Sequence, residues 1–299
     1  MTQTRPAGFD PDELRSVLAR ACRQAGLDAN GAMLIRGQTN AVFRLAHEPV
    51  LVKVARRGTP VGEVRRTVRL VRWLAGRGIP VAPLYPLPAQ PVVVDEVAVT
   101  FWDYLDQTQG AVRAEDLGKP LQELHLLPHP PVDLPPLDAI AAIRRSVESA
   151  MLLKRPVREE LMHRAELLAA RLRDVEYGLP AAVLHADPQH GNALHDHGGV
   201  VLCDWDSARW GQPEWDLVTI EVHCRRFGYG RAQYRAFAEA YGWDVMRWSG
   251  YEVLRDLREL RMITTNARKA SYLPDTLPEV LRRVRLLRAG DAEGAWSIL

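Results

Sequence analysis

The chain has 299 residues, of which 47% are hydrophobic and 25% are charged. This is the composition of an ordinary globular protein, and the length allows two lobes but not many independent domains. The 39 basic and 37 acidic side chains give a net charge of only +2. Nucleic acid and anionic membranes require a concentrated basic surface, so we expect neither as a partner.

The cysteines and the amino terminus bear on the compartment. Cys22, Cys203 and Cys224 are few, odd in number and far apart, which is typical of a reducing compartment without a disulfide framework. Residues 1–6 are followed by polar residues, and no later stretch approaches about 18 uninterrupted apolar residues. These features predict a cytoplasmic protein.

The first hundred residues combine strand patterns with two amphipathic helices. Residues 11–26 place apolar side chains at helical spacing, and 60–76 form a second such stripe. The turn His47-Glu48-Pro49 joins two strand patterns as a hairpin. The strands are predicted over 33–35, 42–46, 50–54, 92–94 and 97–102.

Beyond residue 106 the character of the sequence becomes mainly helical. Helices are predicted over 115–126, 138–153 and 157–175, an island of short strands over 181–208, and further helices from 214 onward. A β-rich front and a helical back predict the α+β class with two lobes. The expected domains are residues 1–102, a hinge at 103–106, and residues 107–299.

Three oxygen-bearing side chains are expected to meet near residue 190. A hairpin turn centred near Gly198 places Asn192 opposite Asp204, about 5 Å apart on one face. Asp187 lies in the loop before this hairpin. Carboxylate and amide oxygens suit Mg²⁺, and phosphoryl transfer needs a metal together with a separate carboxylate that acts as base. Asp187 is the better base because of its place in the loop.

These motifs resemble the aminoglycoside phosphotransferase family, small-molecule kinases of the protein-kinase-like fold. The resemblance rests on His185-Ala186-Asp187 with Asn192, on Asp204-Trp205-Asp206, and on the stretch 211–217. It implies that Asp187 is the catalytic base, that Asn192 and Asp204 hold Mg²⁺, and that His185 and Asp216 support the loop. Ala186 departs from the family, which usually has glycine there. Asp206 remains an alternative ligand to Asp204.

Two other interpretations compete for this segment. His185, His190, His195, His197 and Cys203 are imidazole and thiolate donors that suit zinc, but they lack the spacing of a zinc site. The aspartates and Asn192 would alternatively serve only turns and caps. The two spacings together favour the interpretation as a metal and base site.

The front of the chain supplies candidates for nucleotide binding. Lys53 lies within an apolar strand, where an unpaired ammonium is costly, and pairing about Glu48 places it opposite Phe43. The bend Gly37-Gln38-Thr39-Asn40 is expected to lay backbone N–H groups over phosphates. A hinge over 100–105, with Trp102 and Tyr104, is expected to bind the adenine.

The resemblance also implies a glutamate that pairs with Lys53 from the following helix. Glu63 is the only acidic residue between Lys53 and Gly76, although the family's usual position falls one turn later, on Thr67. A glutamate at a helix start is also favoured by the helix dipole alone.

The acceptor is the least determined part of the sequence. Residues 205–251 hold 11 of the 21 aromatic side chains, and residues 216–299 contain 11 acidic and 14 basic residues. Because this region is not rich in acid, the family name does not make a polycationic aminoglycoside the substrate. The candidate acceptor-binding residues are Asp206, Trp210, Glu221 and Glu259.

The sequence therefore predicts a kinase that moves the γ-phosphate of ATP or GTP, with Mg²⁺, to a hydroxyl of an antibiotic or related natural product. A housekeeping sugar or amino-alcohol kinase is one alternative. A nucleotide-binding pseudokinase is another, and the presence of Lys53, Asp187, Asn192 and Asp204 argues against it. We expect a monomer or weak dimer.

Overall fold

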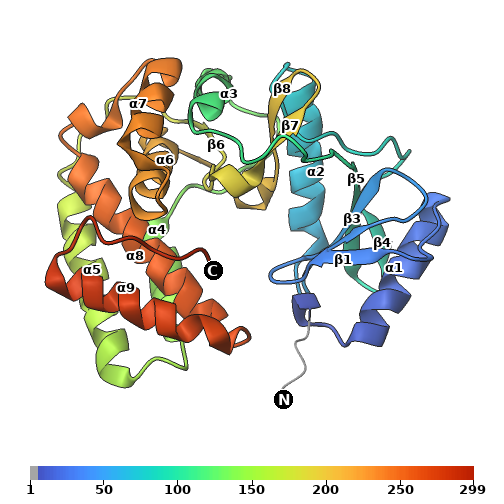
Figure 1. The fold of residues 1–299 in the computed structure, drawn as a ribbon, viewed down its shortest axis with the longest axis horizontal. Helices are drawn as coiled ribbons and strands as arrows, with labels where there is room; N and C mark the ends of the chain where they lie inside the picture. The colour runs from blue at the N-terminus through green and yellow to red at the C-terminus, as the bar shows by residue number, and fades with distance from the viewer. Residues whose placement is uncertain (1–5) are drawn as a thin grey trace. The chain divides into compact units, whose positions relative to one another are not determined.

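The computed structural model describes residues 6–299, so residues 1–5 lie outside the described part. The chain divides into two units (Figure 1). The first unit runs to Val112 and also takes residues 130–133 and 191–207; the second unit contains 113–129, 134–190 and 208–299. A single boundary at 103–106 was expected. The first unit extends further, and within it the Gln107 side chain makes two hydrogen bonds with the backbone of His195.

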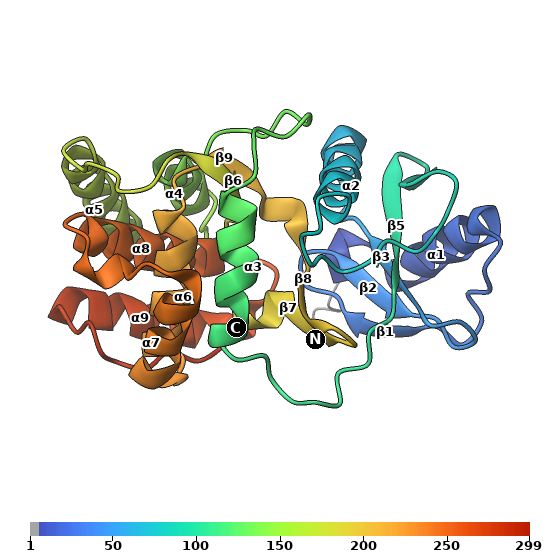
Figure 2. The ribbon, with the colours of Figure 1, turned by 90° about the horizontal axis from the view of Figure 1, so that it is seen from above.

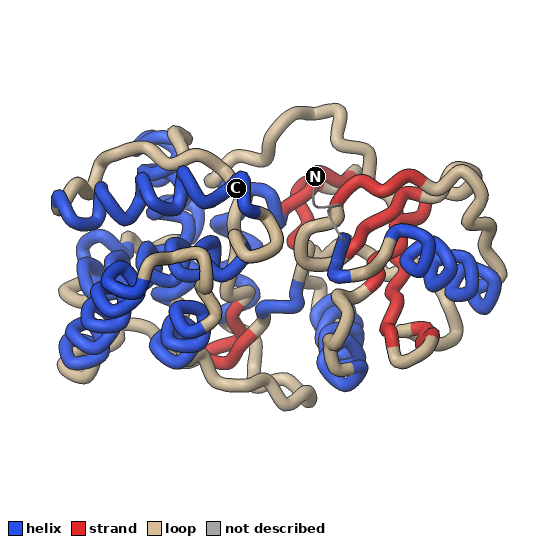
Figure 3. The backbone as a smooth tube through the Cα atoms, turned by 90° about the horizontal axis from the view of Figure 1, so that it is seen from below, coloured by secondary structure: helices blue, strands red, loops and turns tan. Residues whose placement is uncertain are grey.

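A five-stranded antiparallel sheet forms the centre of the first unit, and its strands are the main group of red segments in Figure 3. The spatial order is β1-β2-β3-β5-β4. The strand bounds are β1 (Met33–Arg36), β2 (Ala41–Arg44), β3 (Val50–Val54), β4 (Val92–Val94) and β5 (Val97–Asp103). Helix α1 (Pro11–Ala25) packs on this sheet, and Phe43, Val52 and Phe101 lie in the shared core.

Strand register differs from the prediction by one residue in both hairpins. Lys53 pairs with Val42, not with Phe43, and Ala193 of β7 (Ala193–Asp196) pairs with Leu202 of β8 (Gly199–Leu202), so Asn192 does not lie opposite Asp204. The prediction placed the centre of each hairpin turn on a single residue, Glu48 in one and Gly198 in the other. Both loops instead have an even number of residues, so each centre falls between two residues.

The β7–β8 hairpin belongs to the first unit although it is distant in sequence. The backbone N–H of Ala82 donates to the carbonyl of Leu202, and Leu202 donates to Pro80. Helix α2 (Val61–Ala75) packs against the short 3-10 helix Trp205–Ser207. These contacts place residues 204–206 in the same unit as β3.

The second unit is a group of helices with one small strand pair (Figure 2). Strand β6 (Ala182–Leu184) pairs with β9 (Arg209–Gly211). Helix α3 packs on α7, and α8 contacts α4, α5 and α6. The helix bounds are α3 (Glu115–His125), α4 (Ala139–Glu148), α5 (Arg155–Leu172), α6 (Glu214–Arg226), α7 (Gly230–Tyr241), α8 (Tyr251–Lys269) and α9 (Leu277–Ala289).

The predicted α+β class is confirmed, with a sheet-rich first part and a helical second part. Most predicted elements agree with the structure to within a few residues; for example, the helix expected over 60–76 is Val61–Ala75. Residues 6–299 contain no helix with both the length and the apolar composition that a bilayer crossing needs.

Candidate active site

Lys53 lies at the centre of a charged group in the first unit. Strand alternation places Val50, Val52 and Val54 in the core and turns Lys53 to the other face of the sheet. Its Nζ lies 2.7 Å from an oxygen of Asp204 and 2.7 Å from an oxygen of Asp206. Burial alone lowers the pKa of Lys53, but the two carboxylates raise it above its ordinary value. The ammonium is therefore held in its charged form.

The carboxylates come from a strained turn that follows β8. Asp204 adopts a φ of 62°, a left-handed conformation that aspartate tolerates better than most residues. Trp205 is buried and its Nε1 donates to the carbonyl of Leu202, which anchors the turn. Asp206 also accepts a hydrogen bond from Asn40 at 2.9 Å. Strain of this kind is typical of functional sites.

The donor set of this group fits a hard divalent cation. Asp204 and Asp206 keep 40% and 41% of their side-chain surface exposed, and Asn192 belongs to the same unit. Carboxylate and amide oxygens are the ligands that Mg²⁺ prefers, and Mg²⁺ usually retains water and phosphate oxygens as further ligands. The side chains of the first unit therefore suit a magnesium ion carried by a triphosphate.

Glu63 does not take part in the charged group around Lys53. It is exposed in the first turn of α2, and the ion pairs of Lys53 are made with Asp204 and Asp206 instead. Thr67, one turn later, is buried and donates its hydroxyl to the carbonyl of Glu63. The structure thus differs from the expected pairing, because Glu63 sits at the exposed helix start that the helix dipole favours.

Several polar groups of the bend at residues 37–40 and of the hinge at 100–105 already make hydrogen bonds within the protein. The side chain of Asn40 donates to Asp206 and accepts from the N–H of Arg56 at 3.0 Å. The N–H groups of Asp103 and Tyr104 donate to Pro83 and Pro49, so they are not open donors for an adenine edge. Trp102 is buried, and its Nε1 donates to Thr100. Gly37, Gln38 and Thr39 lie between β1 and β2.

Asp187 lies in the second unit, in the loop after β6. Its carboxylate accepts a hydrogen bond from Arg258 of α8 at 2.5 Å, and its side chain is 34% exposed. Burial alone raises the pKa of Asp187, but the charge of Arg258 and its hydrogen bond to the carboxylate bring the pKa below its ordinary value. The group is therefore an ionised carboxylate that remains partly accessible.

The loop that carries Asp187 is fixed by a buried carboxylate. Asp216, at the start of α6, accepts the backbone N–H groups of His185 and Ala186 at 2.8 and 2.9 Å. His125 contacts the same carboxylate through Nε2 at 3.2 Å. Asp216 and His185 are fully buried. Two charge-assisted hydrogen bonds to consecutive amides hold the backbone just before Asp187 in one conformation.

A match to a protein-family model shows which family this chain belongs to. The model of the phosphotransferase enzyme family, APH, matches residues 33–257. The chain belongs to the phosphotransferase enzyme family. The match covers most of both units, including Lys53, Asp187, Asn192 and Asp204. As a member, the chain is a small-molecule kinase, a phosphotransferase that acts on hydroxyl groups.

Solved structures of APH-type kinases share the fold. A choline/ethanolamine kinase family protein from Mesorhizobium loti is 18% identical, with 93% of this chain and 99% of that chain covered and a TM-score of 0.62. Spectinomycin phosphotransferase APH(9)-Ia, solved with ADP and spectinomycin, is 15% identical, with 94% of each chain covered and a TM-score of 0.64.

A third similar structure is amicoumacin kinase hAmiN, in complex with AMP-PNP and Ca²⁺. It is 12% identical, with 97% of this chain and 96% of that chain covered and a TM-score of 0.67. Identities this low establish the fold alone. A search of curated proteins found no significant match.

The APH family's usual glycine before the aspartate has a geometric explanation in this chain. Ala186 adopts a φ of 66°, in the left-handed region where a side chain carries a steric cost of about 1–2 kcal/mol. The conformation is maintained because Asp216 accepts the Ala186 N–H and Trp215 Nε1 donates to the Ala186 carbonyl at 3.1 Å. This APH member therefore carries strain beside Asp187.

Histidines beside Asp187 are held neutral by burial. His190 stacks on Tyr229 with ring centroids 3.7 Å apart, and burial lowers its pKa to about 4. Burial and the charge of Arg258 lower the pKa of His223 to about 3. In the described residues, no group of three or more His, Cys, Asp or Glu side chains is arranged to hold a metal ion, which leaves the zinc interpretation without a site.

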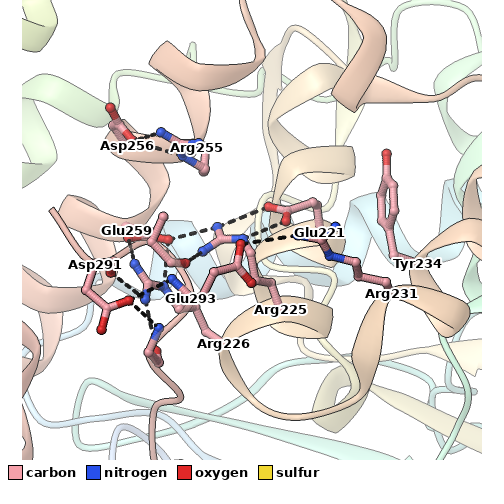
Figure 4. Close-up of polar contacts among 12 residues, drawn as sticks. Glu221, Arg225, Arg226, Arg231, Tyr234, Arg255, Asp256, Glu259, Asp291 and Glu293 are labelled. Atoms are coloured by element: carbon pink, nitrogen blue, oxygen red, sulfur yellow. Dashed lines mark hydrogen bonds and ion pairs between the residues drawn. The ribbon is translucent and has the colours of Figure 1, made fainter. Parts of the chain in front are cut away.

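Glu221 and Glu259 are engaged by arginines. Arg225 contacts both glutamates, at 2.7 and 2.8 Å, and Arg226 contacts Glu259 at 2.6 Å (Figure 4). All four side chains are less than a tenth exposed. Their charges therefore cancel within the unit rather than forming an acidic pocket. The fourth acceptor candidate, Trp210, lies on β9 with its ring 4.5 Å from that of His129.

Arg258, Arg261 and His223 were not singled out from the sequence. Arg258 lies 71 residues after Asp187, so no local spacing connects them. One signal was present: Arg258 interrupts a buried helical stripe formed by Leu254, Leu257 and Leu260. A charge within such a stripe usually has a specific partner.

A cavity of about 710 Å³ lies in the first unit. It is bounded by the end of α2, the segment 78–87 and the β7–β8 hairpin. None of the predicted site residues lines it. A smaller cavity of about 110 Å³ in the second unit is lined in part by Glu221, Arg225 and Arg255.

Proposed function

We propose that this chain transfers the γ-phosphate of ATP or GTP to a hydroxyl of a natural product, with Mg²⁺ as the metal and antibiotic resistance or self-protection as the setting. The observation that carries the nucleotide half is the contact of Lys53 with both Asp204 and Asp206. Lysine and two carboxylates supply the cation and the metal ligands that phosphoryl transfer requires. In this proposal Lys53 binds the phosphates, and Asn192 and Asp204 hold the metal.

The proposed step is an in-line transfer. A bond forms between the acceptor oxygen and the γ-phosphorus, and the bond from phosphorus to the bridging oxygen breaks, with its electron pair leaving on the nucleoside diphosphate. Asp187 accepts the proton of the attacking hydroxyl. A bound Mg²⁺ would supply charge neutralisation on the phosphates. Support for the base comes from the ionised, 34% exposed carboxylate of Asp187 and from the loop that Asp216 fixes.

Similar structures support a small-molecule acceptor but name different ones. Their names include spectinomycin and choline or ethanolamine. The pairing of Glu221 and Glu259 with Arg225 and Arg226 disfavours an acceptor with several positive charges, because no free carboxylate is left to bind it there. We therefore do not propose a polycationic aminoglycoside as the acceptor.

The test is nucleotide turnover with Mg²⁺ and a panel of hydroxylated compounds, followed by Asp187→Asn. We expect the variant to lose activity by about 100- to 10,000-fold, as for loss of a general base, while nucleotide affinity is retained. Asp256→Asn is a matched control, because Asp256 also pairs with an arginine and is 35% exposed. An Asp187→Asn variant with undiminished activity would show that another group is the base.

A further inference from the structure

Helix α8 carries two arginines on the face that lies toward Asp187. Arg258 and Arg261 are three residues apart and therefore share a face of the helix. Arg258 is 6% exposed and donates to Asp187 through one terminal nitrogen. Its Nε is buried and has no hydrogen-bond partner within residues 6–299. Arg258 thus has donor capacity that Asp187 alone does not use.

Arg261 makes its hydrogen bonds with neutral groups. Its side chain is partly buried between α8 and α4, and it donates to the hydroxyls of Ser146, at 3.2 Å, and Thr265. The charged groups that act on it most strongly are the cations Arg258, Arg268 and Arg145 and the carboxylate of Asp187. That carboxylate is already bound by Arg258. Positive charge therefore exceeds negative charge beside Asp187.

Three other arginines of the second unit have carboxylate partners. Arg225 and Arg226 are paired with Glu221 and Glu259, as Figure 4 shows, and Arg255 is paired with Asp256. The unit thus supplies carboxylates to arginines elsewhere. A partly buried arginine without one is unfavourable unless an anion binds it. Burial and, after it, the neighbouring cations also lower the pKa of Arg261 to about 10, although the Asp187 carboxylate acts in the opposite direction.

We propose that Arg261 binds an anionic group of the acceptor, a carboxylate or a phosphate ester, while the acceptor's hydroxyl lies at Asp187. The guanidinium is suited to this because its planar donors match the oxygens of carboxylate and phosphate. Arg258 holds Asp187 and adds to the positive field. The acceptor class is then a hydroxy acid or phosphorylated alcohol. The role of the hydroxyl rests on the proposed function, whereas the anion site does not.

The anion site is tested first without nucleotide, by thermal unfolding of the full chain. The probes are D-glycerate and glycerol 3-phosphate, with glycerol and choline as the neutral and cationic comparisons, and sodium chloride holds the ionic strength constant. We expect at least one anionic probe to raise Tm in a saturable way, by about 2–4 °C. The two anionic probes distinguish a carboxylate from a phosphate site.

Variants assign the effect to Arg261. Arg261→Gln should abolish the Tm shift and Arg261→Lys should keep part of it, whereas Arg255→Gln, on the same helix but paired with Asp256, should keep all of it. The proposal is overturned if neither anion exceeds matched chloride, or if Arg261→Gln retains the shift.

A kinetic measurement separates this inference from the proposed function. With an acceptor found by the screen, Arg261→Gln should raise the acceptor KM by about 10- to 100-fold, the effect of losing a charge-assisted hydrogen bond, and leave the nucleotide KM unchanged. If the enzyme phosphorylates only cationic acceptors, the proposed anion site is wrong and the proposed phosphotransferase activity is still supported. If anions raise Tm in an Arg261-dependent way but no acceptor is phosphorylated, the anion site is supported and the proposed phosphotransferase activity is contradicted.

Discussion

The Lys53 ammonium and the Asp206 carboxylate are 2.7 Å apart, and Asp204 lies at the same distance from the same nitrogen. One cation thus separates two carboxylates that are two residues apart in the sequence. Removing the cation leaves two like charges together, whereas removing one carboxylate leaves an ordinary ion pair. The two kinds of substitution therefore have different expected results.

Lys53→Met should weaken nucleotide binding at least about tenfold and reduce the free energy of unfolding by about 1–2 kcal/mol at neutral pH. The value is at the low end for a broken ion pair, because the carboxylates are about 40% exposed and water screens their repulsion. Urea unfolding with EDTA and with Mg²⁺ measures it, and Mg²⁺ should restore part of the loss. Lys119→Met, on a 65% exposed lysine, is the control. Equal stability of the two variants would contradict the expectation.

Asp204→Asn should reduce kcat by about 100-fold or more, the effect of losing a group that stabilises charge in the transition state. Asp206→Asn should reduce kcat by less. Asp206 additionally accepts a hydrogen bond from Asn40, which gives it a structural role. Initial rates measured against Mg²⁺ concentration distinguish the two ligands. A greater metal requirement in Asp206→Asn would reverse the assignment.

Ala186→Gly should stabilise the protein by about 1 kcal/mol. The φ of 66° is left-handed, so the Cβ of alanine is strained there and glycine removes the strain. The gain is partly offset by the greater chain entropy of glycine in the unfolded state. Chemical denaturation provides the measurement. Ala208→Gly is the comparison, since Ala208 is buried without a left-handed φ and should be destabilised instead.

Asp216→Asn should lower the free energy of unfolding by about 2–4 kcal/mol, because the buried carboxylate accepts two backbone N–H groups and the asparagine amide would face a donor. The kcat should fall while the nucleotide KM is kept, since the displaced loop carries Asp187. Asp275→Asn, at an exposed position, should change neither quantity. A variant that loses stability but keeps kcat would separate the loop from catalysis.

Stability should decline as pH falls from about 6.5 toward 4. The folded state keeps His190 and His223 neutral, with pKa values lowered to about 4 and about 3, while unfolded histidines bind protons below about 6.5. The unfolded state therefore binds more protons in this window, at up to about 1.4 kcal/mol per pH unit for each histidine. His223→Gln should remove one histidine's share of the slope, and exposed His47→Gln should not.

Sequence periodicity was sufficient for the elements but not for register. The stripes of α1 and α2 and the short strands follow directly from residue spacing. Register depends on where each turn is centred, and one residue of error moved Lys53 from Phe43 to Val42. The expectation that the Lys53 ammonium needs a counter-charge does not depend on register, and its side chain, 16% exposed, lies against two carboxylates.

The partners of the charged residues could not be predicted from spacing. Asp206 is 153 residues from Lys53, and Arg258 is 71 residues from Asp187. Such pairs are set by packing of distant segments, which a single sequence does not reveal. Glu63 was predicted because it is the only acidic residue between Lys53 and Gly76, whereas the ion pairs of Lys53 in the structure are made with the distant Asp204 and Asp206.

The first unit is built from segments that are not continuous in sequence, and this affects how it folds during synthesis. Lys53 leaves the ribosome long before residues 204–206, which neutralise it, so the nascent sheet holds an uncompensated ammonium for about 150 residues of synthesis. A fragment ending at Val112 would lack both carboxylates and the β7–β8 hairpin. We expect the first unit to complete its fold only after residues 191–207 have emerged, so a single cleavage of the chain cannot separate the two units.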